Sequence, residues 1–132
     1  MKKQPIVFDI DGTLTAEPYN EEKLGSLREN SAMMLVAFAL QLERPLIIAT
    51  ARSERHRQVT EDWLASHGLK PVKIYMRPEA KEGIPPSFIK ETYLRDIRKN
   101  FGDPLVWADD NGSTIDMLRK HNVPVIHVNA EE

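Results

Sequence analysis

The sequence predicts an α/β fold in which a five-stranded parallel sheet lies between two layers of helices. Five short apolar runs, rich in β-branched and aromatic residues, alternate with longer segments of mostly helical periodicity. This alternation is typical of a parallel sheet with helices on its faces. A length of 132 residues fits one domain with a single core, so we expect residues 1–132 to form one domain.

The individual elements follow from periodicity and from residues that start or stop helices. The expected strands are residues 5–9, 45–50, 72–76, 104–108 and 124–128, and the expected helices are 21–42, 53–68, 86–100 and 113–121. Ser53 is a candidate N-cap for the second helix, and Gly68 is a candidate left-handed residue at its end. Residues 77–86 form the one irregular stretch long enough to suggest a functional loop.

Composition excludes several classes of function. The chain is 41% hydrophobic and 29% charged, with a net charge of −2, which is ordinary for a globular protein and argues against a generally DNA-coating surface. The absence of cysteine rules out thiol catalysis, cysteine-ligated zinc and disulfides. The longest apolar stretch, residues 32–40, is far shorter than the roughly 20 residues that span a bilayer. We therefore expect a cytoplasmic protein with no membrane partner.

Asp9 and Asp11 are the strongest functional signal. They follow a predicted buried strand and open a glycine turn, and ligands of open α/β sheets bind at the carboxyl ends of the strands. Residues two apart in an extended chain lie on the same side, so both carboxylates can face one ligand, such as the hard cation Mg²⁺. Capping of the turn by the two aspartates is the alternative, and the full string Asp-Ile-Asp-Gly-Thr-Leu-Thr over residues 9–15 disfavours it.

Polar residues also follow the second and fourth predicted strands. Thr50, Ala51 and Arg52 come just before a helix N-terminus, where backbone amides bind anions, so a phosphate fits there. A helix cap at Thr50 is the alternative. Asp109 and Asp110 follow the fourth strand and suggest a cation site. Turn formation competes for Asp110 and explains Asp109 poorly.

These motifs, in this order, resemble those of the haloacid dehalogenase superfamily, whose phosphatases form an aspartyl-phosphate. The string at 9–15 is similar to the first motif, Thr50 to the second, a helix-borne lysine to the third, and Asp109-Asp110 to the fourth. The resemblance covers nearly the whole chain. It implies a three-layer αβα Rossmann-like sandwich without a cap domain, because neither the segment after the first motif nor residues 77–86 can hold one.

A closer resemblance is to the phosphatase domain of polynucleotide kinase-phosphatases. It is carried by residues 48–54 (Ile-Ala-Thr-Ala-Arg-Ser-Glu), 76–78 (Met-Arg-Pro), Lys90-Glu91, and 115–119 (Ile-Asp-Met-Leu-Arg) after the acidic pair. Ala51 departs from the pattern, since a glycine is frequent there, and this affects how closely the backbone approaches phosphate. No GxxxxGK[ST] loop is present, so the kinase motif is missing.

The resemblance implies a role for each motif. Asp9 is the expected nucleophile, and Asp11 the general acid and then the general base. Mg²⁺ would be held by Asp9, the backbone carbonyl of Asp11 and Asp109, with direct or water-mediated support from Asp110. Thr50 and a lysine would bind the phosphoryl oxygens.

Lys90 is the expected phosphate-binding lysine, with Lys73 and Lys81 as rivals. Lys90 lies on a helix that leads toward the acidic fourth strand, whereas Lys73 lies within a strand and Lys81 within the loop. Arg52 and Arg77 are candidates for contacts with the rest of the substrate, and surface salt bridges are the alternative.

The sequence leaves the substrate open. An uncapped site suits a polymer end, and a basic set that includes Arg52, Arg55, Arg57, Lys70, Lys73, Arg77 and Lys81 can line a groove for a nucleic-acid strand. We therefore expect a Mg²⁺-dependent phosphomonoesterase, with a nucleic-acid 3′-phosphate as the leading substrate. A small-metabolite phosphatase closed by homo-oligomerisation and a non-catalytic phosphate-binding module are the alternatives.

Overall fold

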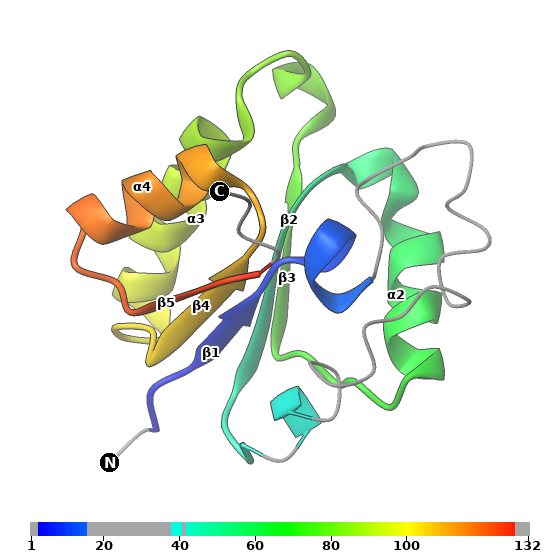
Figure 1. The fold of residues 1–132 in the computed structure, drawn as a ribbon. Helices are drawn as coiled ribbons and strands as arrows, with labels where there is room; N and C mark the ends of the chain where they lie inside the picture. Colours follow the sequence, from blue (N-terminus) through cyan, green and yellow to red (C-terminus); the bar gives the residue numbers. More distant parts are fainter. Residues whose placement is uncertain (1–2, 16–37, 41, 129–132) are drawn as a thin grey trace.

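A five-stranded, all-parallel sheet forms the centre of the computed structural model, which describes residues 3–15, 38–40 and 42–128. Its order is β3-β2-β1-β4-β5, and Figure 1 shows its twist. The strands are β1 (Ile6–Phe8), β2 (Leu46–Ser53), β3 (Lys73–Arg77), β4 (Val106–Asp109) and β5 (Val125–His127). The predicted fold class is confirmed.

Helices cover both faces of this sheet. α2 (Arg57–Ser66) lies on one face, and α3 (Pro86–Asn100) and α4 (Gly112–Lys120) lie together on the other (Figure 1). Short helical turns, η1 (Ile10–Leu14), η3 (Glu54–His56) and η4 (Glu79–Lys81), occupy connections near the carboxyl ends of the strands. The helix expected over residues 21–42 falls mostly outside the described residues, although residues 38–40 are helical.

Two hydrophobic clusters, one on each face, explain why the strands are continuous apolar runs. In β1, Ile6 and Phe8 pack into the cluster that contains Trp63 of α2. Val7, between them, packs into the cluster that contains Ile97 of α3. Side chains alternate across a strand, so a sheet covered on both faces needs apolar residues at consecutive positions.

Two element boundaries show how tertiary contacts modify local signals. β2 continues to Ser53, beyond the expected end at residue 50, because Ser53 pairs with Arg77 of β3 after a register shift. The side chain of Ser53 still accepts a hydrogen bond from the Arg55 backbone N–H, so it caps η3 ahead of α2. At the other end of α2, Gly68 adopts a φ of 75° and its N–H bonds to the carbonyl of Ala65, which confirms the predicted left-handed cap.

The chain changes direction across the sheet between β1 and β4. From β1 it proceeds to β2 and β3 on one side, then returns to place β4 and β5 on the other. The carboxyl ends of strands at such a point form a crevice that α/β proteins use for binding. Phe8 pairs with Ala108 here, so the residues that follow, Asp9 and Asp109, are neighbours. No helix in the described part of the chain is long and apolar enough to cross a bilayer.

Candidate active site

Three carboxylates meet at the carboxyl ends of β1 and β4. Asp9 follows β1, Asp109 ends β4 and Asp110 comes next, and each offers an oxygen within 4.8 Å of the others. The Asp9 backbone N–H bonds to the carbonyl of Ala108 at 3.0 Å, which fixes Asp9 against β4. Asp9 and Asp109 are buried, whereas Asp110 is partly exposed.

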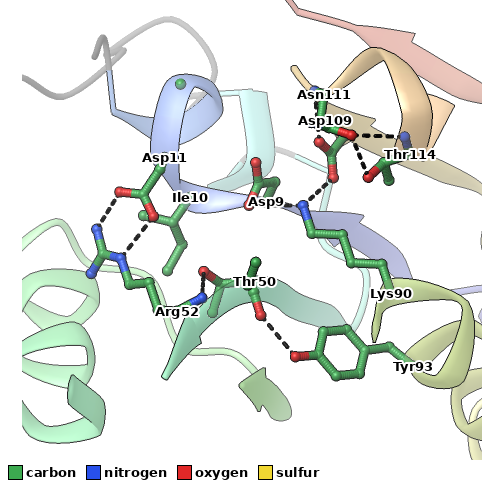
Figure 2. Close-up of polar contacts among 12 residues, drawn as sticks. Asp9, Ile10, Asp11, Thr50, Arg52, Lys90, Tyr93, Asp109, Asn111 and Thr114 are labelled. Carbon is green, nitrogen blue, oxygen red and sulfur yellow. Dashed lines mark hydrogen bonds and ion pairs between the residues drawn. The ribbon is translucent and has the colours of Figure 1, made fainter. Parts of the chain in front are cut away.

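Lys90 of α3 is the cation that contacts this cluster. Its ammonium lies 2.7 Å from Asp109 Oδ2 and 3.3 Å from Asp9 Oδ1, as Figure 2 shows. The side chain is almost wholly buried. Burial acts to lower the pKa of Lys90, but the charges of Asp9 and Asp109 outweigh it and raise that pKa above its ordinary value. Lys90 is therefore charged at neutral pH.

The carboxylates still outnumber the cation. Burial first, and then the charge of Asp109, raise the pKa of Asp9 well above its ordinary value, although Lys90 opposes the shift. Burial also raises the pKa of Asp110. Carboxylate oxygens are the donors that Mg²⁺ prefers, and a divalent cation would offset both the burial of these carboxylates and their mutual repulsion. The residues present thus fit a hard divalent cation.

A tight turn brings Gly12 against the side chain of Asp110. Within η1, Gly12 has a φ of 78°, which is in the region that favours glycine. A Cβ at Gly12 would lie 2.7 Å from the Asp110 Cγ, so the glycine is also required by close approach. The Gly12 N–H bonds to Thr15 Oγ1 at 3.1 Å, which closes the turn.

Asp11 turns away from the acidic cluster and pairs with Arg52 (Figure 2). The guanidinium donates from Nε to Oδ2 at 2.9 Å and from Nη2 to Oδ1 at 2.7 Å. Its Nη1 donates to Thr60 Oγ1 at 2.9 Å, which anchors it to α2. Bidentate pairing fixes a carboxylate in direction as well as in position. The Asp11 side chain is accordingly not one of the three clustered carboxylates, and the metal contact expected of Asp11 is through its backbone carbonyl.

Thr50 lies beneath the site. It is fully buried, and its hydroxyl accepts a hydrogen bond from the Arg52 backbone N–H at 3.1 Å. Its carbonyl accepts a hydrogen bond from the Tyr93 hydroxyl of α3 at 2.9 Å. Ala51, the next residue, lines the cavity described below. The phosphate-binding roles of Thr50 and Ala51 stay predictions.

Arg77 supports a loop. It is the last residue of β3 and is buried. Its guanidinium donates to the carbonyls of Ala51, Lys81 and Ile84 at 3.0, 2.8 and 2.6 Å. These bonds tie the loop between β3 and α3 to the end of β2. Arg77 therefore stabilises the cavity wall, a role that the sequence did not suggest.

These residues surround one open cavity of about 460 Å³. Acidic groups and Lys90 lie at the sheet, and arginines and the loop form the remaining wall. The lining residues are Asp9, Asp11, Ala51, Arg52, Ser53, Arg55, Arg77, Glu82, Gly83, Pro86, Lys90, Asp110 and Asn111. Lys73 and Lys81, the rivals of Lys90, do not line it; both are exposed, and Lys73 lies over the ring of Tyr75.

Sequence reasoning missed the residues that hold the site from behind. The Trp107 indole N–H donates to Asp109 Oδ2 at 3.3 Å, and Tyr93 and Thr60 contact Thr50 and Arg52. Asn111 is the N-cap of α4, and its side chain accepts a hydrogen bond from the Thr114 backbone N–H. Trp107 alternates with Asp109 along β4, which is a usable signal that both lie on one face. Tyr93 and Thr60 carried no such signal.

The sequence model described as "Polynucleotide kinase PNKP phosphatase domain" matches residues 3–132. The chain belongs to this family. It is a haloacid dehalogenase-like phosphatase domain, as its motifs indicated. No curated protein sequence is similar enough to the chain to count as a match.

Solved structures share the fold. A chain in "Structure of Pnkp1/Rnl/Hen1 complex" superposes with a TM-score of 0.79 at 21% identity, over 99% of this chain and 47% of that one. A chain in "Structure of the Pnkp1/Rnl/Hen1 RNA repair complex" gives 0.78 at 21% identity, over 100% and 45%. A chain in "Structure of DsGPDH of Dunaliella salina" gives 0.54 at 13% identity, over 89% and 22%. This chain therefore spans less than half the length of these structures.

The turn at Gly12 gives a prediction with a matched control. Gly12→Ala should lower the free energy of unfolding, measured by urea denaturation, by at least about 1 kcal/mol more than Gly68→Ala does. The reason is that, of the two glycines, only Gly12 faces a carboxylate. Gly68 has a φ of 75° and no atom within 4 Å of an added Cβ, so it reports the backbone cost alone, about 1–2 kcal/mol. Equal losses in the two variants would show that Gly12 and Asp110 are not in close contact.

The Trp107 hydrogen bond gives a second prediction. Trp107→Phe should weaken Mg²⁺ binding by about tenfold, because partners of metal-binding carboxylates tune affinity. Trp63→Phe is the control, since the Trp63 indole N–H is buried without a partner among the described residues. Mg²⁺ titration of tryptophan fluorescence measures binding, and in the Trp63→Phe protein Trp107 is the sole tryptophan. Equal affinities in the two variants would contradict the role of Trp107.

Proposed function

We propose that this chain is a Mg²⁺-dependent phosphomonoesterase that forms an aspartyl-phosphate on Asp9 and acts on a nucleic-acid 3′-phosphate. The observation that carries the chemistry is the Asp9 carboxylate, which lines an open cavity, lies within 4.8 Å of two other acids and contacts Lys90. Membership in the polynucleotide kinase PNKP phosphatase domain family supports the substrate class. A structural relative is described as part of an RNA repair complex, which favours a nucleic-acid end as the partner.

In the first step, an Asp9 oxygen attacks phosphorus while the ester bond to the leaving oxygen breaks. Asp11, protonated before this step, donates that proton to the leaving oxygen and becomes a carboxylate. In the second step, Asp11 takes a proton from a water molecule, and the water oxygen attacks the phosphorus of the aspartyl-phosphate, so that inorganic phosphate leaves and Asp9 is restored. A covalent intermediate divides one difficult displacement into two easier ones, and one side chain serves as acid and then base.

The remaining side chains supply position and charge, which phosphoryl transfer mainly requires. Lys90 and the Thr50 hydroxyl bind phosphoryl oxygens. Arg52 orients Asp11 through the bidentate pair, and each carboxylate oxygen retains a lone pair for proton transfer. Mg²⁺, held by Asp9, Asp109, Asp110 and the Asp11 carbonyl, would neutralise charge on the transferred group.

The same proposal takes residues 1–132 as one domain. Both faces of the sheet are covered, and each hydrophobic cluster brings together residues of the first strand and of the last strand. A cytoplasmic location and closure of the site by a second copy of the chain stay predictions.

A substrate panel tests the function. The protein should release phosphate from a 3′-phosphorylated oligonucleotide faster than from a 5′-phosphorylated one or from sugar phosphates, and only with Mg²⁺. Asp9→Asn should lose at least about 2.7 kcal/mol of barrier lowering, a hundredfold in rate, and should still fold, because it removes a charge that burial disfavours. Preference for sugar phosphates would favour the metabolite phosphatase, and inactivity toward every substrate would favour the phosphate-binding module.

Asp11→Asn tests the acid and base assignment. The rate loss should be smaller for an aryl phosphate than for an alkyl phosphate, because a good leaving group needs less protonation. A burst measurement must accompany the steady-state rates, since slow hydrolysis of the aspartyl-phosphate would equalise the losses. Equal losses without a burst would rule Asp11 out as the general acid.

A further inference from the structure

An ion pair lies in the wall of the same cavity, away from β1 and β4. Arg55 of η3 and Glu82 of the loop before α3 both line the cavity. Arg55 Nη1 is 3.2 Å from Glu82 Oε1, and the two side chains are 47% and 49% exposed. The pair therefore joins the segment after β2 to the segment after β3, and water reaches both groups.

In this part of the wall, not every arginine pairs with a carboxylate of the described residues. Arg52 is paired with Asp11, so its charge is neutralised within the site. Arg77 donates to three backbone carbonyls, and in the described residues no carboxylate pairs with it. Glu82 thus pairs with Arg55, and Arg77 lines the same cavity.

We propose that Arg55 binds a second anionic group of the substrate, the phosphodiester on the 5′ side of the terminal 3′-phosphorylated nucleotide. Glu82 occupies Arg55 until that phosphodiester arrives. The inference rests on the proposed function, because it takes the scissile phosphate to bind at Asp9 and Lys90. An exposed ion pair is weak, and a guanidinium binds a phosphate as well as a carboxylate through two parallel hydrogen bonds, so a phosphodiester can replace Glu82 at Arg55.

Arg55 is a better test of this subsite than Arg77. Removing Arg77 would release the loop carbonyls of Lys81 and Ile84 and would change the shape of the cavity. Arg55 is half-exposed, and its contacts include the side chains of Glu82 and His56. A change of substrate preference in an Arg55 variant therefore reports on charge in the wall.

The experiment compares kcat/KM for a nucleoside 3′-monophosphate, a nucleoside 3′,5′-bisphosphate and a dinucleotide with a 3′-phosphate. The second and third substrates carry the additional anion. The bisphosphate carries it without a second nucleotide, so it shows whether the anion alone is sufficient. Arg55→Gln should lower the ratio of dinucleotide to monophosphate kcat/KM by about tenfold, mostly through KM. In the wild type this ratio should fall with added salt, and less so in the variant.

Glu82→Gln separates binding from a structural role. Both Arg55→Gln and Glu82→Gln break the same ion pair, so a structural role predicts changes in the same direction. The proposal predicts opposite directions, because Glu82→Gln removes the competitor and should raise the ratio a few-fold. Arg98→Gln is the control, since Arg98 forms an ion pair with Asp103, 2.9 Å away, at the far end of α3.

Each outcome of this experiment either supports or overturns the subsite. Changes in opposite directions support the subsite, and equal changes for the bisphosphate and the dinucleotide show that the second anion is sufficient. An unchanged ratio in Arg55→Gln, or shifts in the same direction in both variants, overturns the subsite while the proposed function stands. Wild-type protein that cleaves none of the three substrates overturns the proposed function, and with it the subsite.

Discussion

The buried contact of Lys90 with Asp9 and Asp109 is the interaction on which the site depends. Two carboxylates and an ammonium are held in a place with almost no solvent, and such groups are costly to bury unless they are paired. The sheet imposes this arrangement. Asp9 and Asp109 follow paired residues of adjacent parallel strands, so they cannot separate without breaking β1 from β4. Lys90 keeps them together, and the charge that remains makes the position suited to a cation.

The three arginines of the cavity differ in what they do, although sequence treats them alike. Arg52 gives two hydrogen bonds to Asp11 and a third to Thr60, so it orients the Asp11 carboxylate. The Arg77 guanidinium donates hydrogen bonds to three backbone carbonyls and so fixes the shape of the wall. Arg55 is the half-exposed one, and its carboxylate partner is half-exposed as well. The arginine that is easiest to reach from solvent is therefore the one suited to exchange its partner for a substrate group.

The site and the cavity wall draw on different parts of the fold. The acidic cluster is built from strand ends, which are fixed by the central sheet. The wall is built from η3 and the loop between β3 and α3. Strand ends are held by the sheet, whereas loops vary more readily between related proteins. The acidic cluster therefore lies on the fixed part of the fold, and the wall lies on the part that can vary.

The sequence by itself determined the sheet, the strand ends and the residues that follow them. Apolar runs of β-branched residues are local signals, and alternation along β1 places Asp9 and Asp11 at the end of a buried strand. The tertiary structure decided which side chains meet. Arg52 reaches Asp11 from 41 positions away, and the Trp107 indole N–H donates to Asp109. Nothing in the sequence indicated that Arg77 donates hydrogen bonds to loop carbonyls. Periodicity reports which face of an element is covered, whereas partners across elements depend on distances that only packing sets.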